Sequence, residues 1–345
     1  MKQLILCASI AALAMSSCSN DGSTLTPGST ESKAVGFSTF VEKTTRGDNV
    51  VTGTTYPTGG NFLVMGYNTG STSGTLSSNS ALNFMRNVVS FDGTSYTYYP
   101  THYWTPNNYY SFFAVHPATD VSSVTTPAAI GGSNLPSVDL TVNADPQNQA
   151  DLMMASALDQ TSTSAAGKVQ FNFGHQLSRI GFNAQLASDY TSVGAYVRVN
   201  SIVVSNVASE AKFAFNKTGV ISVTPVTTGQ SFTLSSSNML NQGVVSSVGT
   251  SVRLNLSNAY LLMIPADYSA AGSTATITVN CTVAYADATS STFTITKKLS
   301  DLNTANKWTA GQAYDYDMTI SLTSVTFSAA ISADWSATPT SASVN

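Results

Sequence analysis

Short stretches of alternating apolar and polar residues recur along the chain from Ala34 onward. The first of them places four residues on one face of a predicted strand, namely Val35, Phe37, Thr39 and Val41. The apolar run Phe62–Tyr67 is typical of a buried strand. Turn residues interrupt such stretches about every ten positions, which is the spacing of a β-sandwich or barrel. The pattern therefore predicts an all-β protein.

The same pattern divides the chain into two parts. Residues 118–150 are rich in Pro and Gly and are predicted to be mostly loops, and the polar stretch Asp159–Lys168 is predicted to be a domain boundary. We therefore expect two tandem β-sandwich domains, over residues 34–165 and 166–345. Residues 299–308 are expected to form one or two helical turns. Further strands are expected over 87–91, 96–98, 109–116, 169–173, 197–207, 212–215, 220–226, 231–234, 252–256, 260–264, 275–285, 291–297, 314–322 and 325–335.

The N-terminal region has the features of an export signal. Lys2 precedes an apolar run, Leu4–Met15, that is too short to span a bilayer and ends in small residues. Residues 1–18 are therefore predicted to be a signal peptide, and the polar residues 19–33 a flexible tether. Small residues before Cys18 resemble the lipobox of bacterial lipoproteins, in which the cysteine is acylated. The alternative is ordinary signal cleavage nearby, with Cys18 incidental.

Charge and cysteine content narrow the class of protein. The 345 residues include 14 Lys or Arg and 18 Asp or Glu, a charged fraction of 9% and a net charge of −4, so no electrostatic footprint for nucleic acid is present. Ser, Thr, Asn and Gly replace the missing charges. Cys281 is the lone thiol outside the N-terminal region, so no intrachain disulfide is expected there. It shares a face with apolar residues and is predicted to be a buried hydrophobe.

The residues give no motif for catalysis, metal binding or cofactor binding. The three histidines, His102, His116 and His175, are scattered, and no HExxH, cysteine cluster, EF-hand loop, GxSxG or P-loop occurs. No enzyme, cofactor or metal site is therefore predicted. The aromatic cluster Tyr96–Trp104 is predicted to pack in the first sandwich. A sugar-stacking surface is the alternative.

Several blocks of residues, taken in their order and spacing, resemble the fimbrillin family, the type V pilins of anaerobic Gram-negative bacteria. The resemblance covers nearly all of residues 35–335, and its closest branch is similar to minor-fimbria subunits. The blocks are Gly36–Ser38 with Thr44–Arg46, Phe62–Tyr67, Tyr98–Trp104, Tyr110–Ala114, Asp151–Ala155, Phe171–Ile180, Tyr260–Pro265 and Trp308–Tyr316.

The resemblance implies two transthyretin-like β-sandwiches, exported as an outer-membrane lipoprotein precursor and assembled into a fimbria at the cell surface. An arginine-specific protease would remove an N-terminal segment. A neighbouring subunit would then add an extended strand to the exposed groove, with main-chain hydrogen bonds providing affinity and alternate side chains filling pockets. The implied partners are other pilin subunits, that protease, the outer membrane before maturation, and a host or bacterial surface ligand.

The processing site that fits this scheme is the bond between Arg46 and Gly47. Arg46 follows the first predicted strand and lies in a turn-like segment, where a protease finds exposed, extended chain. Cleavage there would release the lipid, the tether and the strand that carries Val35, Phe37, Thr39 and Val41. The alternative is a solvated loop arginine.

The donor strand that fits this scheme is residues 325–335. One face of this run is apolar at strict period two, with Val325, Phe327, Ala329, Ile331, Ala333 and Trp335. Deletion of residues 325–345 is then expected to leave a folded monomer that does not polymerise. The alternative is an ordinary final strand of the second sandwich.

These observations favour a structural subunit of a cell-surface fimbria that supports adhesion. The second hypothesis is a tip adhesin or an anchored surface lipoprotein that binds glycans and keeps its N-terminus. An enzyme ranks third, because no residue can be nominated for catalysis.

Overall fold

The computed structural model describes residues 33–41, 56–73, 76, 81–163 and 167–332. The residues Cys18, Arg46, Gly47, Ala333 and Trp335 lie outside these ranges. The described chain consists of β-strands with a few short 3-10 turns, so the all-β expectation is confirmed. Within the same ranges, no helix has the length and apolar character needed to cross a bilayer.

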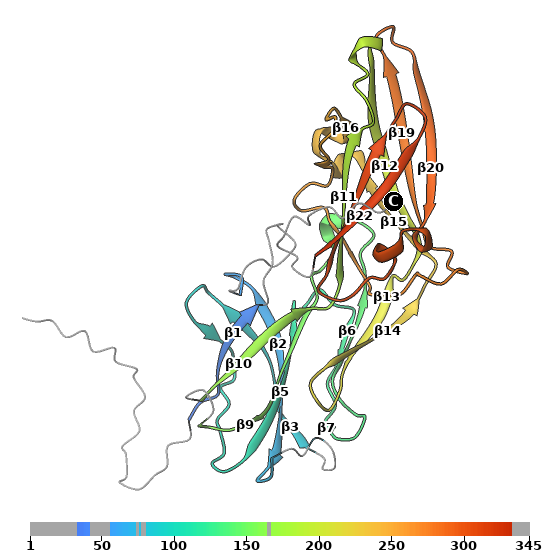
Figure 1. Cartoon of the computed structure of the whole chain (residues 1–345). Helices are drawn as coiled ribbons and strands as arrows, with labels where there is room; N and C mark the ends of the chain where they lie inside the picture. Colours follow the sequence, from blue (N-terminus) through green and yellow to red (C-terminus); the bar gives the residue numbers. More distant parts are fainter. Residues whose placement is uncertain (1–32, 42–55, 74–75, 77–80, 164–166, 333–345) are drawn as a thin grey trace, which may run out of the picture. The chain divides into compact units, whose positions relative to one another are not determined.

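The first part of the chain contributes to two sheets (Figure 1). One is eight-stranded, in the order β1 (Gly36–Val41), β10 (Lys168–His175), β9 (Met153–Gln160), β5 (Tyr109–His116), β2 (Asn61–Gly70), β3 (Ala81–Phe91) and β4 (Tyr96–Thr97), with β7 (Ala129–Ile130) paired to β3. The other is four-stranded, in the order β14 (Ile221–Thr227), β13 (Glu210–Phe215), β8 (Ser137–Thr141) and β6 (Ser123–Thr125).

The rest of the chain contributes two five-stranded sheets. The first has the order β17 (Val252–Arg253), β11 (Ser178–Leu186), β21 (Ala313–Ile320) and β22 (Val325–Ser332), with β18 (Leu261–Met263) also paired to β11. The second has the order β15 (Gln230–Ser235), β12 (Ala195–Val207), β19 (Thr276–Tyr285) and β20 (Ser290–Lys298), with β16 (Val244–Val245) paired to β12.

The eight-stranded sheet is buried on both faces along its central strands. One face contributes Phe62 and Phe112 to an aromatic core, and the other contributes Met65 and Phe113 to a second core. The second core continues through Val138 of β8 and into the C-terminal sheets. Because both faces are covered, β2 and β5 are near-continuous apolar runs rather than alternating ones.

Most of the expected strands are present, with boundaries shifted by a few residues. The prediction for 109–116 matches β5 residue for residue, and 299–308 forms two short 3-10 turns, as expected. Residues 118–150 are mostly loops, as expected, but they also contain the short strands β6, β7 and β8, of which β8 pairs on both sides within its sheet. Its five residues were hidden among Pro and Gly signals. The strand β11 was not expected from the sequence, although Ile180, Phe182, Ala184 and Leu186 alternate there.

Strand pairing crosses the expected boundary between residues 165 and 166. The strand β10 follows that boundary in sequence but pairs with β1 and β9. The hairpin β13–β14 also follows it, yet β13 pairs with β8. The boundary therefore does not separate the sheets, and the division into two tandem transthyretin-like domains stays a prediction.

Cys281 is fully buried on the inner face of β19, in the role expected for it. Burial raises the pKa of its thiol to about 12, so the reactive thiolate is suppressed near neutral pH.

Candidate functional site

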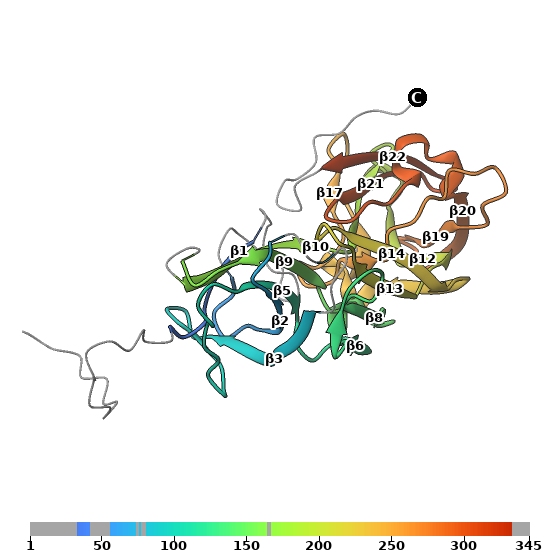
Figure 2. The same cartoon turned by 90° about the horizontal axis from the view of Figure 1, so that it is seen from below.

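The strand β1 closes the curled eight-stranded sheet. Figure 2 shows the sheet bending along its strand order from β1 to β3, and a side-chain hydrogen bond joins β1 to β4. On one side β1 pairs in parallel with β10, from Gly36 opposite Lys168 to Val41 opposite Phe173. On the other side the Thr39 and Tyr96 hydroxyls lie 2.5 Å apart. A strand at one edge of the sheet is thus held from both sides.

The chain after β4 supplies further hydrogen bonds to the residues just before β1. The Val35 amide donates to the His102 carbonyl at 2.9 Å, and the Trp104 amide donates to the Lys33 carbonyl at 2.9 Å. The Tyr98 hydroxyl donates to the Val35 carbonyl at 2.7 Å. Burial raises the pKa of Tyr98 above its ordinary value, which keeps this hydroxyl protonated and able to donate.

The inner face of β1 fills a row of apolar pockets. Val35, Phe37 and Val41 are buried, Thr39 is half-buried, and Phe40 on the other face is 43% exposed. Four rings surround Phe37 at centroid distances of 5.3 to 6.4 Å, namely Tyr98, Phe171, Phe62 and Phe112. Each such side chain stabilises the fold by roughly 1.5–3 kcal/mol. Loss of β1 would therefore leave an aromatic groove that another strand must cover.

The strand β22 lies at the edge of its own sheet, antiparallel to β21. On the face predicted to fill a neighbour's pockets, Val325 and Ala329 are buried in their own sandwich and Phe327 is half-buried. Ile331, towards the end of this face, is 38% exposed. The described chain therefore seats β22 as its own final strand, and its role as a donor stays a prediction.

Edge strands differ in how well they resist pairing with another chain. The edge strand β14 contains Pro225, and the edge strand β20 carries Lys297 and Lys298. Proline and lysine are the usual means of blocking strand addition at an edge. The edge strands β22 and β15 contain neither proline nor a charged residue, so these edges are chemically open to strand addition. The edge strand β1 also lacks both, but hydrogen bonds from the chain around β4 cover its outer side.

The model of the family described as Fimbrillin-like matches residues 49–335. The chain belongs to the fimbrillin-like family. The recognition made from the sequence blocks is thereby confirmed, and family membership supports a fimbrial subunit role at the cell surface. No curated protein sequence matches the chain.

Solved structures share the fold of this fimbrillin-like protein. A fimbrial protein from Bacteroides vulgatus is 17% identical with a TM-score of 0.67, over 88% of this chain and 99% of that one. A proposed cell adhesion protein from Bacteroides uniformis is 18% identical with a TM-score of 0.50, over 88% of this chain and 99% of that one. At these identities the likeness concerns the fold alone.

The way β1 is held in the fimbrillin-like chain was not expected from the sequence. Alternation gave the inner face of the strand, but not the wall of Tyr96, Tyr98 and Trp104 beside it. The signal was present as the aromatic cluster, of which Trp104 is buried whereas Tyr99 and Tyr103 are 90% and 54% exposed. Packing thus accounts for part of the cluster. The predicted sites Cys18, Arg46 and Gly47 lie outside the described residues.

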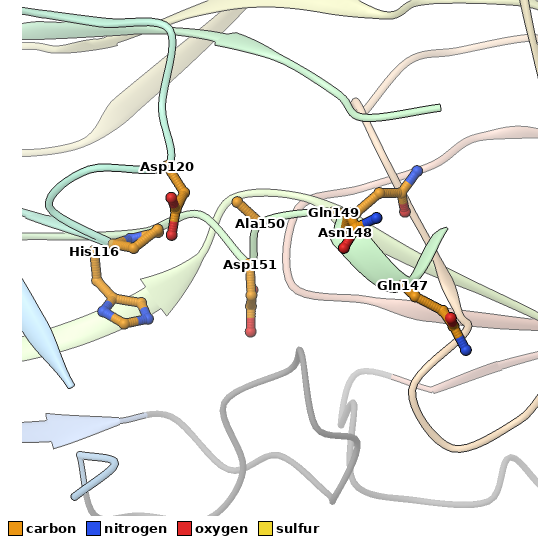
Figure 3. Close-up of a pocket in the computed structure, with 8 residues that line it drawn as sticks. His116, Asp120, Gln147, Asn148, Gln149, Ala150 and Asp151 are labelled. Carbon is orange, nitrogen blue, oxygen red and sulfur yellow. The ribbon is translucent and has the colours of Figure 1, made fainter. Parts of the chain in front are cut away.

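A hollow of about 430 Å³ lies where β5 ends in the fimbrillin-like protein (Figure 3). Its lining includes the half-buried His116, whose Nδ1 lies 2.8 Å from the Asn61 carbonyl oxygen and 2.6 Å from the Tyr56 hydroxyl. Tyr56 is also buried against Phe62 of the aromatic core. His116 therefore ties the chain just before β2 to the end of β5.

Carboxylates also line this hollow. Figure 3 shows Asp120 and Asp151 on the same side of it as His116, and Asp151 lies 2.8 Å from Nδ1 of His175. Among the described residues, no group of three or more His, Cys, Asp or Glu side chains is arranged to hold a metal ion. The observed contacts of His116 join neighbouring parts of the fold.

Acidification is expected to destabilise this region through His116. Its pKa lies below the ordinary value of 6.5, mainly because burial disfavours the imidazolium, and nearby His175 acts in the same direction. The Asn61 carbonyl, Asp151 and Asp120 oppose this shift without cancelling it. The unfolded chain therefore binds a proton first, and stability is lost as pH falls below about 6.5, at up to about 1.4 kcal/mol per pH unit.

Urea unfolding between pH 8 and pH 5 measures this effect. The His116→Gln variant is expected to lose less stability over that range than the parent. His102→Gln is a second variant, because burial against Phe84 of β3 and Tyr98 also lowers the pKa of His102, and it is expected to change the pH profile in the same direction. Equal pH profiles for the parent and His116→Gln would contradict the prediction.

Proposed function

We propose that this chain is a structural subunit of a cell-surface fimbria that polymerises by donor-strand exchange and supports adhesion. In this scheme it is exported as a lipoprotein acylated at Cys18 and is cut by an arginine-specific protease between Arg46 and Gly47. The observation that carries the proposal is the seat of β1, an edge strand whose removal leaves a long aromatic groove.

The order of elements along the chain suits this maturation. The strand β1 ends at Val41, five positions before Arg46. Cleavage after Arg46 would leave β1 joined to the body only by hydrogen bonds and apolar contacts, together with the lipid and tether that precede it. Strand and anchor would then depart together, which frees the subunit from the outer membrane at the moment its groove opens.

The donor in this scheme is the C-terminal run of a neighbouring subunit. Its apolar face would place Val325, Phe327, Ala329, Ile331, Ala333 and Trp335 over the pockets vacated by Val35, Phe37, Thr39 and Val41. Backbone hydrogen bonds to β10 would supply affinity, and the alternate side chains would set the register. The open edge of β22 supports this role, since neither proline nor charge blocks its pairing.

The two-domain organisation is part of the same proposal. We place one transthyretin-like sandwich mainly in residues 34–165 and the other mainly in 166–345, with β10 and the β13–β14 hairpin completing the first. Such a subunit would offer its groove and its donor strand on different sandwiches, which suits a linear polymer.

An arginine-specific protease tests the processing step on purified precursor. The parent is expected to yield a body that starts at Gly47 by mass spectrometry and then to form ladders on a native gel. Arg46→Lys is the matched variant, because it keeps the charge but resists this protease, and trypsin should restore both cleavage and ladders. A parent cut at Gly47 that stays monomeric would contradict the proposal.

The second candidate function is a tip adhesin or an anchored lipoprotein that binds a host or bacterial surface ligand. The exposed Tyr99 and Tyr103 favour it, because free aromatic rings suit glycan stacking. The N-terminus of the surface form distinguishes the two. Gly47 supports the shaft subunit, whereas acylated Cys18 on all recovered protein supports the anchored form.

A further inference from the structure

A small hollow lies on the outer face of the β12–β19 pair, and neither β1 nor β22 contributes a residue to its lining. Its volume is about 170 Å³, and its lining residues are Tyr196, Arg198, Asn200, Thr282 and Ala284. Alternation along β12 directs Val197 and Val199 into the core and leaves Tyr196 and Arg198 exposed on the outer face.

The hollow exists because large and small side chains face each other across the two strands. Tyr196 pairs with Ala284, whose single methyl group leaves the space beside the tyrosine ring open. The ring is 53% exposed and therefore offers a flat apolar face to solvent. On the floor of the hollow Arg198 pairs with Thr282.

A β-bulge adds a polar group to the same place. The register of β12 against β19 shifts between Val199 and Ser201, so Asn200 is the extra residue of the bulge. Its Nδ2 donates to the Thr282 hydroxyl at 2.7 Å, which fixes the orientation of the amide. Bulges commonly redirect one side chain next to a binding site.

The neighbouring polar side chains on this face form hydrogen bonds with one another, whereas Arg198 takes no part in these bonds. Asn280 donates to Ser201 at 2.9 Å and accepts from Thr294 at 2.8 Å, and the Thr278 and Thr296 hydroxyls lie 2.9 Å apart. No hydrogen bond or ion pair links the Arg198 guanidinium to another residue in the described ranges. Its five N–H donors are therefore available to an anion.

We propose that this hollow binds one acidic sugar ring, a uronic acid unit at the end of a glycan. The apolar C–H face of the sugar would stack on Tyr196, and its carboxylate would take two parallel N–H donors from Arg198. Asn200 and Thr282 would meet the ring hydroxyls. The hollow is well below the ~300–1,000 Å³ of sites for larger ligands, which limits it to a single ring.

This binding is independent of polymerisation, because no residue of the hollow belongs to β1 or β22. It would give each copy in a polymer its own weak site for acidic glycans. Many such sites that bind one glycan-covered surface at the same time would raise the overall avidity.

Calorimetric titration of the full chain with two matched probes tests the proposal. Methyl β-D-glucuronide is expected to bind at least about tenfold tighter than methyl β-D-glucoside, since only the former pairs its carboxylate with Arg198. Equal binding of both probes, or no binding of either, would overturn the proposal.

Variants on the outer face locate the site. Arg198→Gln is expected to abolish the preference for the glucuronide. Tyr196→Ala removes the stacking ring and Ala284→Leu fills the hollow, so each is expected to weaken the binding of both probes at least about tenfold. Val226→Ala is the control, because it removes an apolar side chain that is 68% exposed on β14 and does not line the hollow. Unchanged binding in Arg198→Gln would overturn the assignment even if the other variants failed to fold.

Discussion

An Ile331→Asp subunit is expected to fold like the parent and to fail to polymerise. Ile331 is 38% exposed at the end of β22 in its own sheet, so a carboxylate there stays in water. In a donor strand the same side chain would enter an apolar pocket, where an unpaired carboxylate costs several kcal/mol. Subunit affinity is then expected to fall by at least about 100-fold.

Native gels of the matured protein measure polymerisation, and urea unfolding measures the stability of the monomer. Thr326→Asp is the matched control, because Thr326 is exposed on the opposite face of the same strand. It should polymerise normally. Normal ladders from Ile331→Asp would exclude the predicted face as the donor, whereas a large loss of monomer stability would show that β22 acts only within its own sandwich. This substitution is cleaner than deletion of residues 325–345, which also removes Val325 and Ala329 from the core.

Phe37→Ala is expected to lower the free energy of unfolding of the precursor by about 3–5 kcal/mol. Phe37 is 5% exposed and contacts four aromatic rings, so truncation leaves a cavity that packed strands cannot fill. Phe40→Ala is the matched control on the outer face of the same strand, with 43% exposure, and should change stability by only about 0.5 kcal/mol.

Urea unfolding of both precursors measures the difference between their free energies of unfolding. Cleavage at Arg46 then allows the release of β1 to be compared in the two variants. After the cut, Phe37→Ala should release its first strand faster than Phe40→Ala, because fewer apolar contacts hold it. Matched losses of stability in the two variants would mean that β1 is not seated as described. Matched rates of ladder formation would mean that departure of β1 does not limit polymerisation.

Charged residues are few in this chain, and two that are largely buried in the C-terminal sheets pair with each other. Arg253 forms a paired contact with Asp315, with both N–O distances at 2.7 Å, and Asp315 is 1% exposed. Tyr260 lies against both Arg253 and Arg179, with guanidinium carbons 5.1 and 4.4 Å from its ring centroid. The buried pair Arg253–Asp315 in the C-terminal sheets is therefore held together, whereas the exposed Arg198 on the outer face has no ion pair in the described residues.

The sequence by itself determined the class of the fold and the faces of its strands. Alternation is a local property, because successive side chains of a strand point to opposite sides. It was enough to find the buried face of β1 from Val35, Phe37 and Val41, and the apolar face of β19 that carries Cys281. The order of short residue blocks was also enough to identify the family.

Only the tertiary structure decided which strands are neighbours. A period of two gives faces but not partners, because pairing depends on loops that close over long stretches of chain. The sequence could not show that β13 joins β8, that Thr39 meets Tyr96 across the curled sheet, or that a bulge at Asn200 lies beside Ala284. Grooves and hollows arise from such pairings, since their walls come from strands that are distant in sequence and adjacent in space.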